Sequence, residues 1–406
     1  MRFELFMARR YLRGRGKRMF SGITAIAMGG VFVGVAAILI VLSVENGFHQ
    51  ELKDRILGAT PHVVVAKYSY SPIDYPGEGD SLLQKIGRVP GVVSVAPFVY
   101  AKTLVRTENG VEGVVIRGVD PEHESDITGI SGTVSEGEFA FDSGGVVIGV
   151  ELARMLGLSV GDRLNLASPF GGTSTPLGFM PRTRYFRVNG IFDSGMYEYN
   201  SSFIYLSLAA IQQFLGMEGM VTGFEVRVRD VYSSNRIARR ITRELGYPYR
   251  ATDWIMQNRN LFTALRLEKV VTFIVLVLIV LVAAFNIIGM LTMMVIRKTR
   301  EIGILKAMGA KSSTVTRIFV LVGGFIGIIG TGAGAGFGLV ACWLLNKYRF
   351  VSLPGDVYFI KNLPVQMLTQ DFVLVSLAAI LITFAATIYP ALKAARLVPL
   401  EAIRYE

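Results

Sequence analysis

The sequence has one cysteine and three histidines among its 406 residues. A single thiol, Cys342, excludes an intrachain disulfide and a CxxC redox site. The histidines, His49, His62 and His123, are scattered and form no HExxH motif, so we predict no metal site. The sequence also lacks a Gly-x-Ser-x-Gly elbow and a complete phosphate-binding loop. We therefore predict no catalytic residue and a chain that is not itself an enzyme.

Charge is scarce as well, at 18% of residues, and the mean hydropathy is +0.47. A helix crosses the hydrocarbon core of a membrane with about 20 apolar residues. Four uncharged stretches are long enough to do so, namely residues 19–44, 270–296, 318–346 and 372–392. They also contain no histidine, which argues against an ion-coupled carrier, because such carriers need ionisable groups within the membrane. We predict an α-helical membrane protein with four transmembrane helices.

The first of these stretches follows an arginine-rich segment, as the apolar part of a secretory signal would. A signal has only about 7–15 apolar residues and ends at a cleavage site of small residues, which is missing here, so we interpret the stretch as an uncleaved anchor. Within residues 1–18, Phe3, Phe6, Met7 and Tyr11 recur at helical spacing among arginines. That pattern favours a short helix lying in the membrane interface. A basic disordered tail is the alternative.

Basic residues gather in three short flanks, residues 1–18, 297–317 and 393–406. The long segment 45–269 and the short loop 347–371 are nearly balanced in charge. Because basic flanks stay on the cytoplasmic side, both termini and the 297–317 loop are predicted to be cytoplasmic and the 45–269 domain to lie outside. The high isoelectric point then reflects membrane topology and does not indicate nucleic-acid binding.

Residues 45–269 are long enough for one or two hydrophobic cores and mix strand and helix patterns. Alternating runs predict strands at 62–66, 92–105, 111–119, 145–148, 163–167, 185–192 and 224–229. Helical spacing predicts helices at 82–88, 151–156, 208–215 and 233–245. A further amphipathic helix, Asp253–Lys269, is expected to run into the second span, where it would carry motion as a rigid rod.

The segment 169–181 is rich in glycine and proline, which predicts a loop, yet it holds Leu177, Phe179 and Met180. Apolar residues at a loop tip are either buried against their own domain or meet a partner. On the residues alone the two alternatives are equally balanced.

Small residues recur within the spans. Gly330, Gly334 and Gly338 lie every fourth residue in the third span, and Gly30 and Gly34 repeat this spacing in the first. Such spacing predicts close helix-to-helix packing and no ligand site. Asn286, in the second span, is predicted to form an interhelical hydrogen bond.

Three segments resemble the permeases of type VII ABC transporters, the superfamily of the macrolide exporter MacB, the division protein FtsX and the lipoprotein-releasing LolC and LolE subunits. Residues 297–311 (RKTREIGILKAMGAK) are similar to the coupling helix of these permeases. Residues 389–406 resemble the closing signature of LolC and LolE, and residues 42–48 with 56–58 resemble the end of their first span. The likeness covers essentially the whole chain. It is closer to LolC, because residues 175–181 resemble a protruding loop that LolE lacks.

The resemblance implies a permease subunit that takes lipoproteins from the outer leaflet of a bacterial inner membrane and passes them to the periplasmic carrier LolA. The implied partners are a separate LolD-like ATPase, which would hold ATP and Mg, and a second permease that is either LolE-like or another copy of this chain. No cofactor is expected in this chain. The implied carrier-docking residues are Thr175, Pro176, Leu177, Gly178, Phe179, Met180, Pro181 and Arg184. The predicted ATPase-coupling residues are Glu301, Leu305, Lys306 and Met308.

Two other functions remain as alternatives. An FtsX-like regulator would control outside partners without extracting anything, and an exporter subunit would move a small molecule. The apolar residues of the 169–181 loop favour lipoprotein release, because a regulator needs no carrier-docking loop. We predict that work reaches the outer domain by mechanotransmission, with no substrate path through the membrane.

Overall fold

The computed structural model describes residues 2–12, 22–69, 71–120, 123–175, 178–348 and 363–397, without the side chains of residues 2, 23, 125, 143 and 169–180. The described residues fall into two compact units. We call residues 2–49, 265–348 and 363–397 the helical unit. Residues 50–264 form the second unit, which we call the α/β unit.

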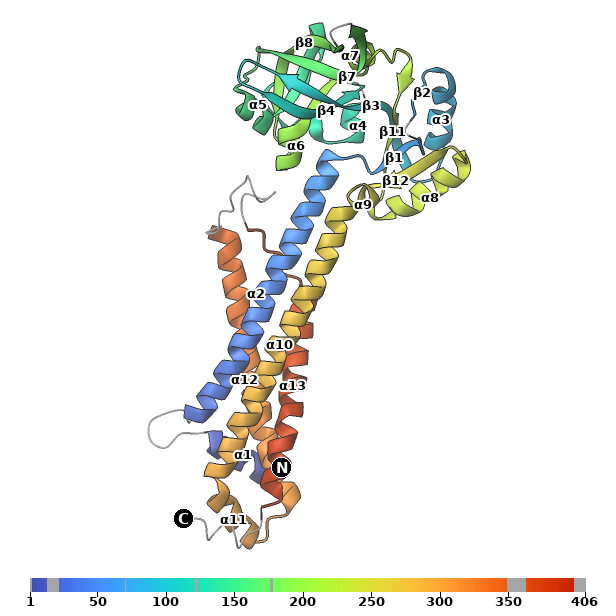
Figure 1. The fold of residues 1–406 in the computed structure, drawn as a ribbon. Helices are drawn as coiled ribbons and strands as arrows, with labels where there is room; N and C mark the ends of the chain where they lie inside the picture. Colours follow the sequence, from blue (N-terminus) through green and yellow to red (C-terminus); the bar gives the residue numbers. More distant parts are fainter. Residues whose placement is uncertain are drawn as a thin grey trace. The chain divides into compact units, whose positions relative to one another are not determined.

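Four helices among the described residues are long and apolar enough to cross a membrane, which confirms the predicted spans (Figure 1). Each helix extends beyond the uncharged stretch that predicted it. Their bounds are α2 Gly22–Ala59, α10 Arg259–Arg297, α12 Ser312–Tyr348 and α13 Thr369–Ala395. Two shorter helices belong to the same unit, α1 Arg2–Leu12 and α11 Thr299–Ala307.

The N-terminal segment is helical, as its apolar spacing predicts. One face of α1 is buried in the helical unit, where the ring of Tyr11 lies 5.9 Å from that of Phe319 in α12. On the opposite face Phe3 and Phe6 remain exposed. The helix therefore binds the bundle with its buried face, and the alternative of a disordered tail is wrong for residues 2–12.

Glycines bring α12 and α2 into contact, as their spacing predicts. A Cβ at Gly334 would lie 2.7 Å from the carbonyl oxygen of Phe32, and one at Gly330 would lie 2.9 Å from Cβ of Val31. Only residues without a side chain permit this approach. Asn286 lies against Gly30, but its Oδ1 is buried without a hydrogen-bond partner among the described residues, which does not bear out the hydrogen bond predicted for it.

The α/β unit is built on a ten-stranded mixed sheet in the order β12-β1-β11-β3-β4-β9-β6-β8-β5, with β7 paired to β3 and β8 (Figure 1). All seven predicted strands are present. The strands of the sheet are β1 Val63–Lys67, β3 Val92–Arg106, β4 Val111–Val119, β5 Val134–Gly137, β6 Gly145–Gly149, β7 Arg163–Thr175, β8 Gly178–Phe192, β9 Phe203–Ser207, β11 Gly223–Val228 and β12 Tyr249–Asp253. A separate pair joins β2 Ile73–Asp74 to β10 Met220–Val221.

Helices cover parts of this sheet and close one large apolar core. The core takes β-branched and aromatic side chains from the strands and packs them against helices such as α3 and α8, through Ile86 and Ile237. All four helices predicted for this unit are present. The helices are α3 Gly77–Gly87, α4 Glu124–Ile127, α5 Val150–Leu156, α6 Tyr197–Ser202, α7 Leu208–Leu215 and α8 Ser234–Leu245.

The predicted rod Asp253–Lys269 begins later than expected. Asp253 ends β12, and its side chain accepts a hydrogen bond from the backbone N–H of Met256, which starts the short helix α9 Trp254–Gln257. Asn258 ends α9 and is not helical, and α10 then runs without a break from Arg259 to Arg297. The prediction of one helix from Asp253 is wrong because an aspartate at this position caps a separate turn.

Candidate functional site

The segment predicted to dock a carrier is the outer end of a long hairpin. Strands β7 and β8 pair along residues 163–168 with 182–187, and again along 173–175 with 178–180, with a register shift between. Most of the predicted loop is therefore strand, because ladder pairing overrides the local preference of its glycines. Pro176 and Leu177 lie outside the described residues. Thr175, Gly178, Phe179 and Met180 lie in the outer pairing, and Pro181 is exposed at the shift.

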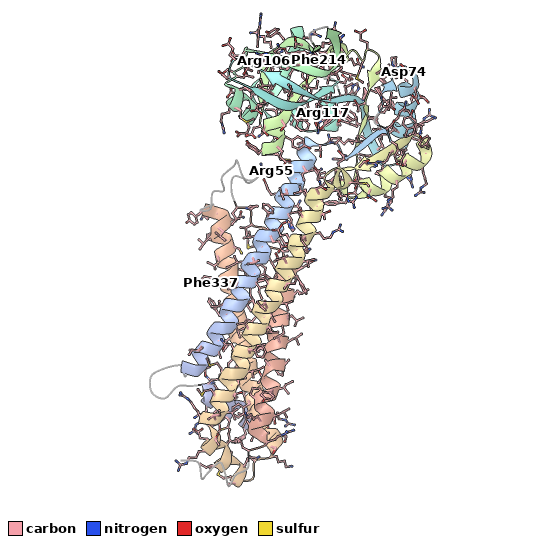
Figure 2. The ribbon with its side chains drawn as sticks, viewed as in Figure 1. Arg55, Asp74, Arg106, Arg117, Phe214 and Phe337 are labelled. Atoms are coloured by element: carbon pink, nitrogen blue, oxygen red, sulfur yellow. The ribbon has the colours of Figure 1, made fainter. Side chains whose placement is uncertain are left out.

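The root of this hairpin is fixed in the core of the α/β unit. Leu166 and Phe186 are buried, and the ring of Phe186 stands edge-on at 6.0 Å from Phe214 in α7. Phe214 is labelled in Figure 2. Strand β3 pairs with β7 only up to Ala167. Beyond that residue the two strands pair only with each other among the described residues, so the outer end projects from an anchored base.

Two arginines brace the root against α7. Arg184 donates from Nη1 to Oε1 of Gln213 at 2.8 Å, and its guanidinium lies 5.3 Å from the ring centroid of Phe186. Arg182 donates from Nη1 to the backbone carbonyl of Gln213 at 3.4 Å. Cations are favourable at the C-terminal end of a helix, so both residues stabilise the position of the hairpin. Arg184 thus braces the hairpin, a role that its sequence position did not reveal, and its docking role stays a prediction.

The predicted coupling residues lie on or beside α11, in the helical unit. Glu301 pairs with Lys298 across 2.5 Å, and Leu305 packs against the core of the unit. Nζ of Lys306 donates to the backbone carbonyls of Ala395 at 2.7 Å and Leu397 at 2.8 Å, at the end of α13. Lys306 therefore clamps α11 to α13 rather than extending into solvent.

A different face of α11 is open to a partner. Met308 is 75% exposed, and Ile304, one turn earlier, is 46% exposed. Arg300 and Lys311 are exposed on either side of them along the chain. Sequence reasoning found Met308 but missed Ile304. The exposure of Ile304 could have been predicted from helical spacing. Ile304 lies four residues before Met308, on the same helix face, and two residues after the buried Ile302, on a different face.

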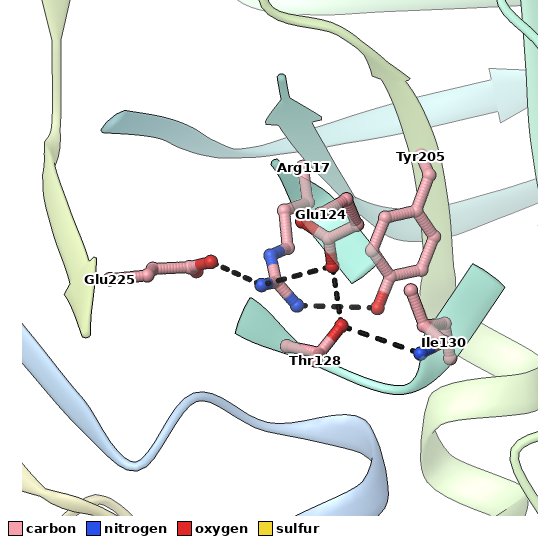
Figure 3. A network of polar contacts seen from close by, with 6 residues as sticks. All are labelled: Arg117, Glu124, Thr128, Ile130, Tyr205 and Glu225. Carbon is pink, nitrogen blue, oxygen red and sulfur yellow. Dashed lines mark hydrogen bonds and ion pairs between the residues drawn. The ribbon is translucent and has the colours of Figure 1, made fainter. Parts of the chain in front are cut away.

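A buried ionic network lies inside the α/β unit and was not predicted (Figure 3). Arg117 of β4 is 4% exposed and forms an ion pair through Nη2 with Glu225 of β11. The same nitrogen lies 3.7 Å from Oε1 of Glu124, and Nη1 lies 3.4 Å from the hydroxyl of Tyr205. Thr128 donates to the carboxylate of Glu124 at 2.5 Å. The guanidinium of Arg117 therefore links strands β4, β9 and β11 with helix α4.

The network holds two carboxylates for one cation. Burial raises the pKa of Glu225 to about 7, the attraction of Arg117 opposes the rise, and the negative charge of Glu124 adds to it. Arg117 and Glu225 also line a cleft of about 460 Å³, together with aromatic residues that include Tyr100 and Phe203. Charged residues in a strand are expected on the solvent side, so nothing in the sequence indicated this pairing.

The histidines occupy three separate places. His49 lies 3.8 Å from Glu268, His62 contacts the backbone of Val228 at 3.1 Å, and His123 pairs with Asp120 at 2.8 Å. No group of three or more metal-ligating side chains occurs in the part of the chain that the structure describes.

Two protein-family models match the chain. A MacB-like periplasmic core domain matches residues 24–244, and an FtsX-like permease C-terminal region matches residues 273–399. The lipoprotein-releasing system transmembrane protein LolC of Xylella fastidiosa (strain 9a5c) is 33% identical, over 98% of this chain and 97% of the relative. LolC of Neisseria meningitidis serogroup B is 31% identical, over 99% of both chains. LolE of Haemophilus influenzae is 28% identical, again over 99% of both.

Proposed function

Because the chain belongs to the LolC/LolE family of lipoprotein-releasing transmembrane proteins, we propose that it transmits work from a cytoplasmic ATPase to lipoproteins in the outer leaflet. At the level of the family it is a multi-pass inner-membrane permease of an ABC transporter and a non-catalytic subunit of it. The transmission of force, the transfer of the lipoprotein to a carrier and the identity of the partner subunits are parts of the proposal.

The orientation is proposed from charge. Arg297, Lys298 and Arg300 surround the start of α11, and further basic residues lie before α2 and after α13. These flanks favour the cytoplasm, so both termini and α11 would lie inside and the α/β unit in the periplasm.

The continuity of α10 is the observation that carries the proposed transmission. This helix runs for 39 residues, with its first turns in the α/β unit and the rest in the helical unit. Only Lys298 separates its end from α11, and Lys306 fastens α11 to the end of α13. A force applied at α11 would therefore move two membrane helices together, and α10 would carry the displacement outward.

Work is needed because a lipid anchor does not leave the bilayer unaided. Each buried CH₂ of an acyl chain contributes about 0.8 kcal/mol to membrane binding. The proposed energy source is a LolD-like ATPase that holds ATP and Mg, while this chain holds no cofactor. The family implies paired permeases, and we propose that the second is a LolE-like chain or another copy of this one.

The handoff is assigned to the β7–β8 hairpin. Its root is anchored by Phe186 and braced by Arg184, so the outer end would meet the carrier LolA with little loss of freedom on binding. The segment 175–181 contains Leu177, Phe179 and Met180, which are suited to fill an apolar groove.

The transmission is tested by breaking α10 at Ala264, an exposed residue within the helix. Proline in a helix interior costs about 3 kcal/mol and interrupts the hydrogen bonding. In the reconstituted complex, Ala264→Pro should leave ATP hydrolysis in place and reduce lipoprotein release by about tenfold or more. The matched control is Ala264→Ser, which keeps the helix. Equal release by the two variants would remove α10 from the mechanism.

A further inference from the structure

The outer face of α8 carries four arginines and also exposes Asn235 and Glu244. Arg236, Arg239, Arg240 and Arg243 are all exposed and follow the spacing of one helix face, which we call the arginine stripe. Other residues of this unit form ion pairs, such as Lys67 with Glu78 and Arg154 with Glu151, but none of these four arginines forms one within the described part of the chain. The positive charges of the stripe are therefore not held in ion pairs by their own domain.

The other face of α8 fixes the stripe in place. Ile237, Ala238 and Ile241 are buried in the core of the α/β unit. The backbone N–H of Ala251 in β12 also donates to Oγ1 of Thr242 at 2.9 Å. The arginines consequently project from a rigid base, over about 10 Å of helix between Arg236 and Arg243.

Aromatic and apolar residues flank the stripe. Tyr232, just before α8, is 67% exposed, and Tyr247, just after it, is 90% exposed. In the adjoining helix α9, Met256 is 51% exposed. Tyrosine and arginine together are typical of the headgroup region of a membrane, where one end of each side chain is apolar and the other is wet.

Chain connectivity limits how far this region can lie from the start of the second span. Trp254 of α9 donates from Nε1 to the carbonyl of Val231 at 3.3 Å, and its ring meets Phe262 of α10 edge-on at 5.2 Å. From Phe262 to Val270, where the uncharged stretch begins, α10 rises about 12 Å. Tilting α10 can only reduce the height of Phe262 above Val270, so about 12 Å is the upper limit of that height. The headgroup layer extends about 5–7 Å above the hydrocarbon.

We propose that the arginine stripe binds the anionic phospholipid headgroups of the leaflet next to the α/β unit. Guanidinium groups bind phosphate oxygens in a bidentate manner, and a row of four suits a continuous anionic surface. An acidic protein is less well matched, because protein interfaces centre on buried apolar residues and the stripe has none. The identity of the leaflet as the outer one rests on the proposed function. The contact would hold the α/β unit against the surface from which a lipoprotein is lifted.

The test uses the full chain with its partner subunits in nanodiscs. A fluorophore is attached at Asn235→Cys, an exposed position of α8, in a Cys342→Ala background. Its quenching by nitroxide-labelled headgroups is compared in discs of phosphatidylcholine alone and discs that also contain phosphatidylglycerol. We expect stronger quenching with phosphatidylglycerol, and loss of that difference in high salt, because exposed charges are screened.

Two sets of substitutions separate the stripe from net charge. Replacing its four arginines with glutamine should abolish the phosphatidylglycerol-dependent quenching, whereas replacing them with lysine should retain most of it. A matched control removes four exposed basic residues of the sheet and should leave the quenching unchanged; its residues are Lys102, Arg106, Arg163 and Arg187.

Equal quenching in the two kinds of disc would overturn the proposal. So would an unchanged glutamine variant, or one that loses a protein subunit while its lipid-dependent quenching persists, which would mark a protein interface instead. Nanodiscs expose both leaflets, so this result does not depend on which side is outside. Lipoprotein release is measured in parallel and reports separately on the proposed function.

Discussion

In the α/β unit the sheet and its helices meet through large buried side chains, whereas in the helical unit α12 meets α2 at glycines. Phe224 and Ile116 are fully buried in the first, and Gly334 touches the backbone of Phe32 in the second. Water drives the burial of apolar surface, but lipid does not, so membrane helices gain from close backbone approach. The two units thus pack by different rules. Each should therefore be destabilised most by a different kind of substitution.

The largest effect is expected at Arg117, the buried cation of the ionic network in the α/β unit. Arg117→Met would leave Glu225 and Glu124 buried without their cation, which should cost about 3–5 kcal/mol of unfolding free energy. Arg106→Met, at an exposed arginine of β3, is the control and should change little. Figure 2 labels both arginines. Thermal unfolding of the purified full chain measures the effect of both substitutions. A loss below 1 kcal/mol for Arg117→Met would mean that the network contributes no more than an exposed ion pair.

The helical unit should be most sensitive to added volume. Gly334→Leu places a side chain against the backbone of α2 and should destabilise the unit by about 3 kcal/mol, the upper end for overpacking. Gly332→Leu adds the same volume on the same helix where a Cβ meets nothing within 4 Å. The two melting curves should therefore differ clearly. If they coincide, the glycine contacts do not hold α12 to α2.

At the surface of the α/β unit, changes should affect binding and not stability. Phe179→Asp, at the outer end of the hairpin, should cost about 2 kcal/mol of carrier binding, since interface energy is concentrated in a few apolar anchors. Thermal stability and ATP hydrolysis should stay nearly constant. Calorimetric titration of LolA into the complex measures the affinity. An unchanged affinity would place carrier docking elsewhere in the unit.

The surface of the helical unit offers the matching test. Ile304→Asp should weaken ATPase association about tenfold, or about 1.4 kcal/mol, because Ile304 of α11 and Met308 just after it form an exposed apolar pair. Glu301→Lys should act in the same direction with a smaller effect. Lys306→Glu should in addition lower the melting temperature, because Lys306 binds the end of α13. Copurification of the ATPase, followed by melting curves, distinguishes these outcomes.

Per unit of pH, the smallest effect is a pH dependence confined to the α/β unit. The pKa of Glu225 is raised from 4.5 to about 7, so the folded state binds more protons than the unfolded state between these values. Stability should therefore fall as pH rises from about 5 to 7, by on the order of 1 kcal/mol per pH unit. Glu225→Gln should flatten this slope. The same slope with and without Glu225 would assign it to another group.

Local sequence patterns predicted the helices and strands, because these depend mainly on residues close together in the sequence. Uncharged stretches located α2, α10, α12 and α13, and alternation located strands such as β4 with correct bounds. Contacts between distant residues were not predictable in this way. Arg117 and Glu225 lie 108 positions apart, and Lys306 binds a carbonyl 89 positions away. The extent of the hairpin was also missed, because the pairing of Thr173 with Met180 is a property of the sheet and not of either segment.

Pro181 gives the hairpin a property that concerns solubility. Beyond Ala167 the described strands carry outer edges with no sheet neighbour, and such edges are templates on which a second chain can add a strand. Pro181 is exposed at the register shift and has no backbone N–H to offer. It interrupts the row of donors along β8, so an incoming strand cannot extend past it. The outer part of the hairpin is therefore a poorer template for edge-to-edge aggregation.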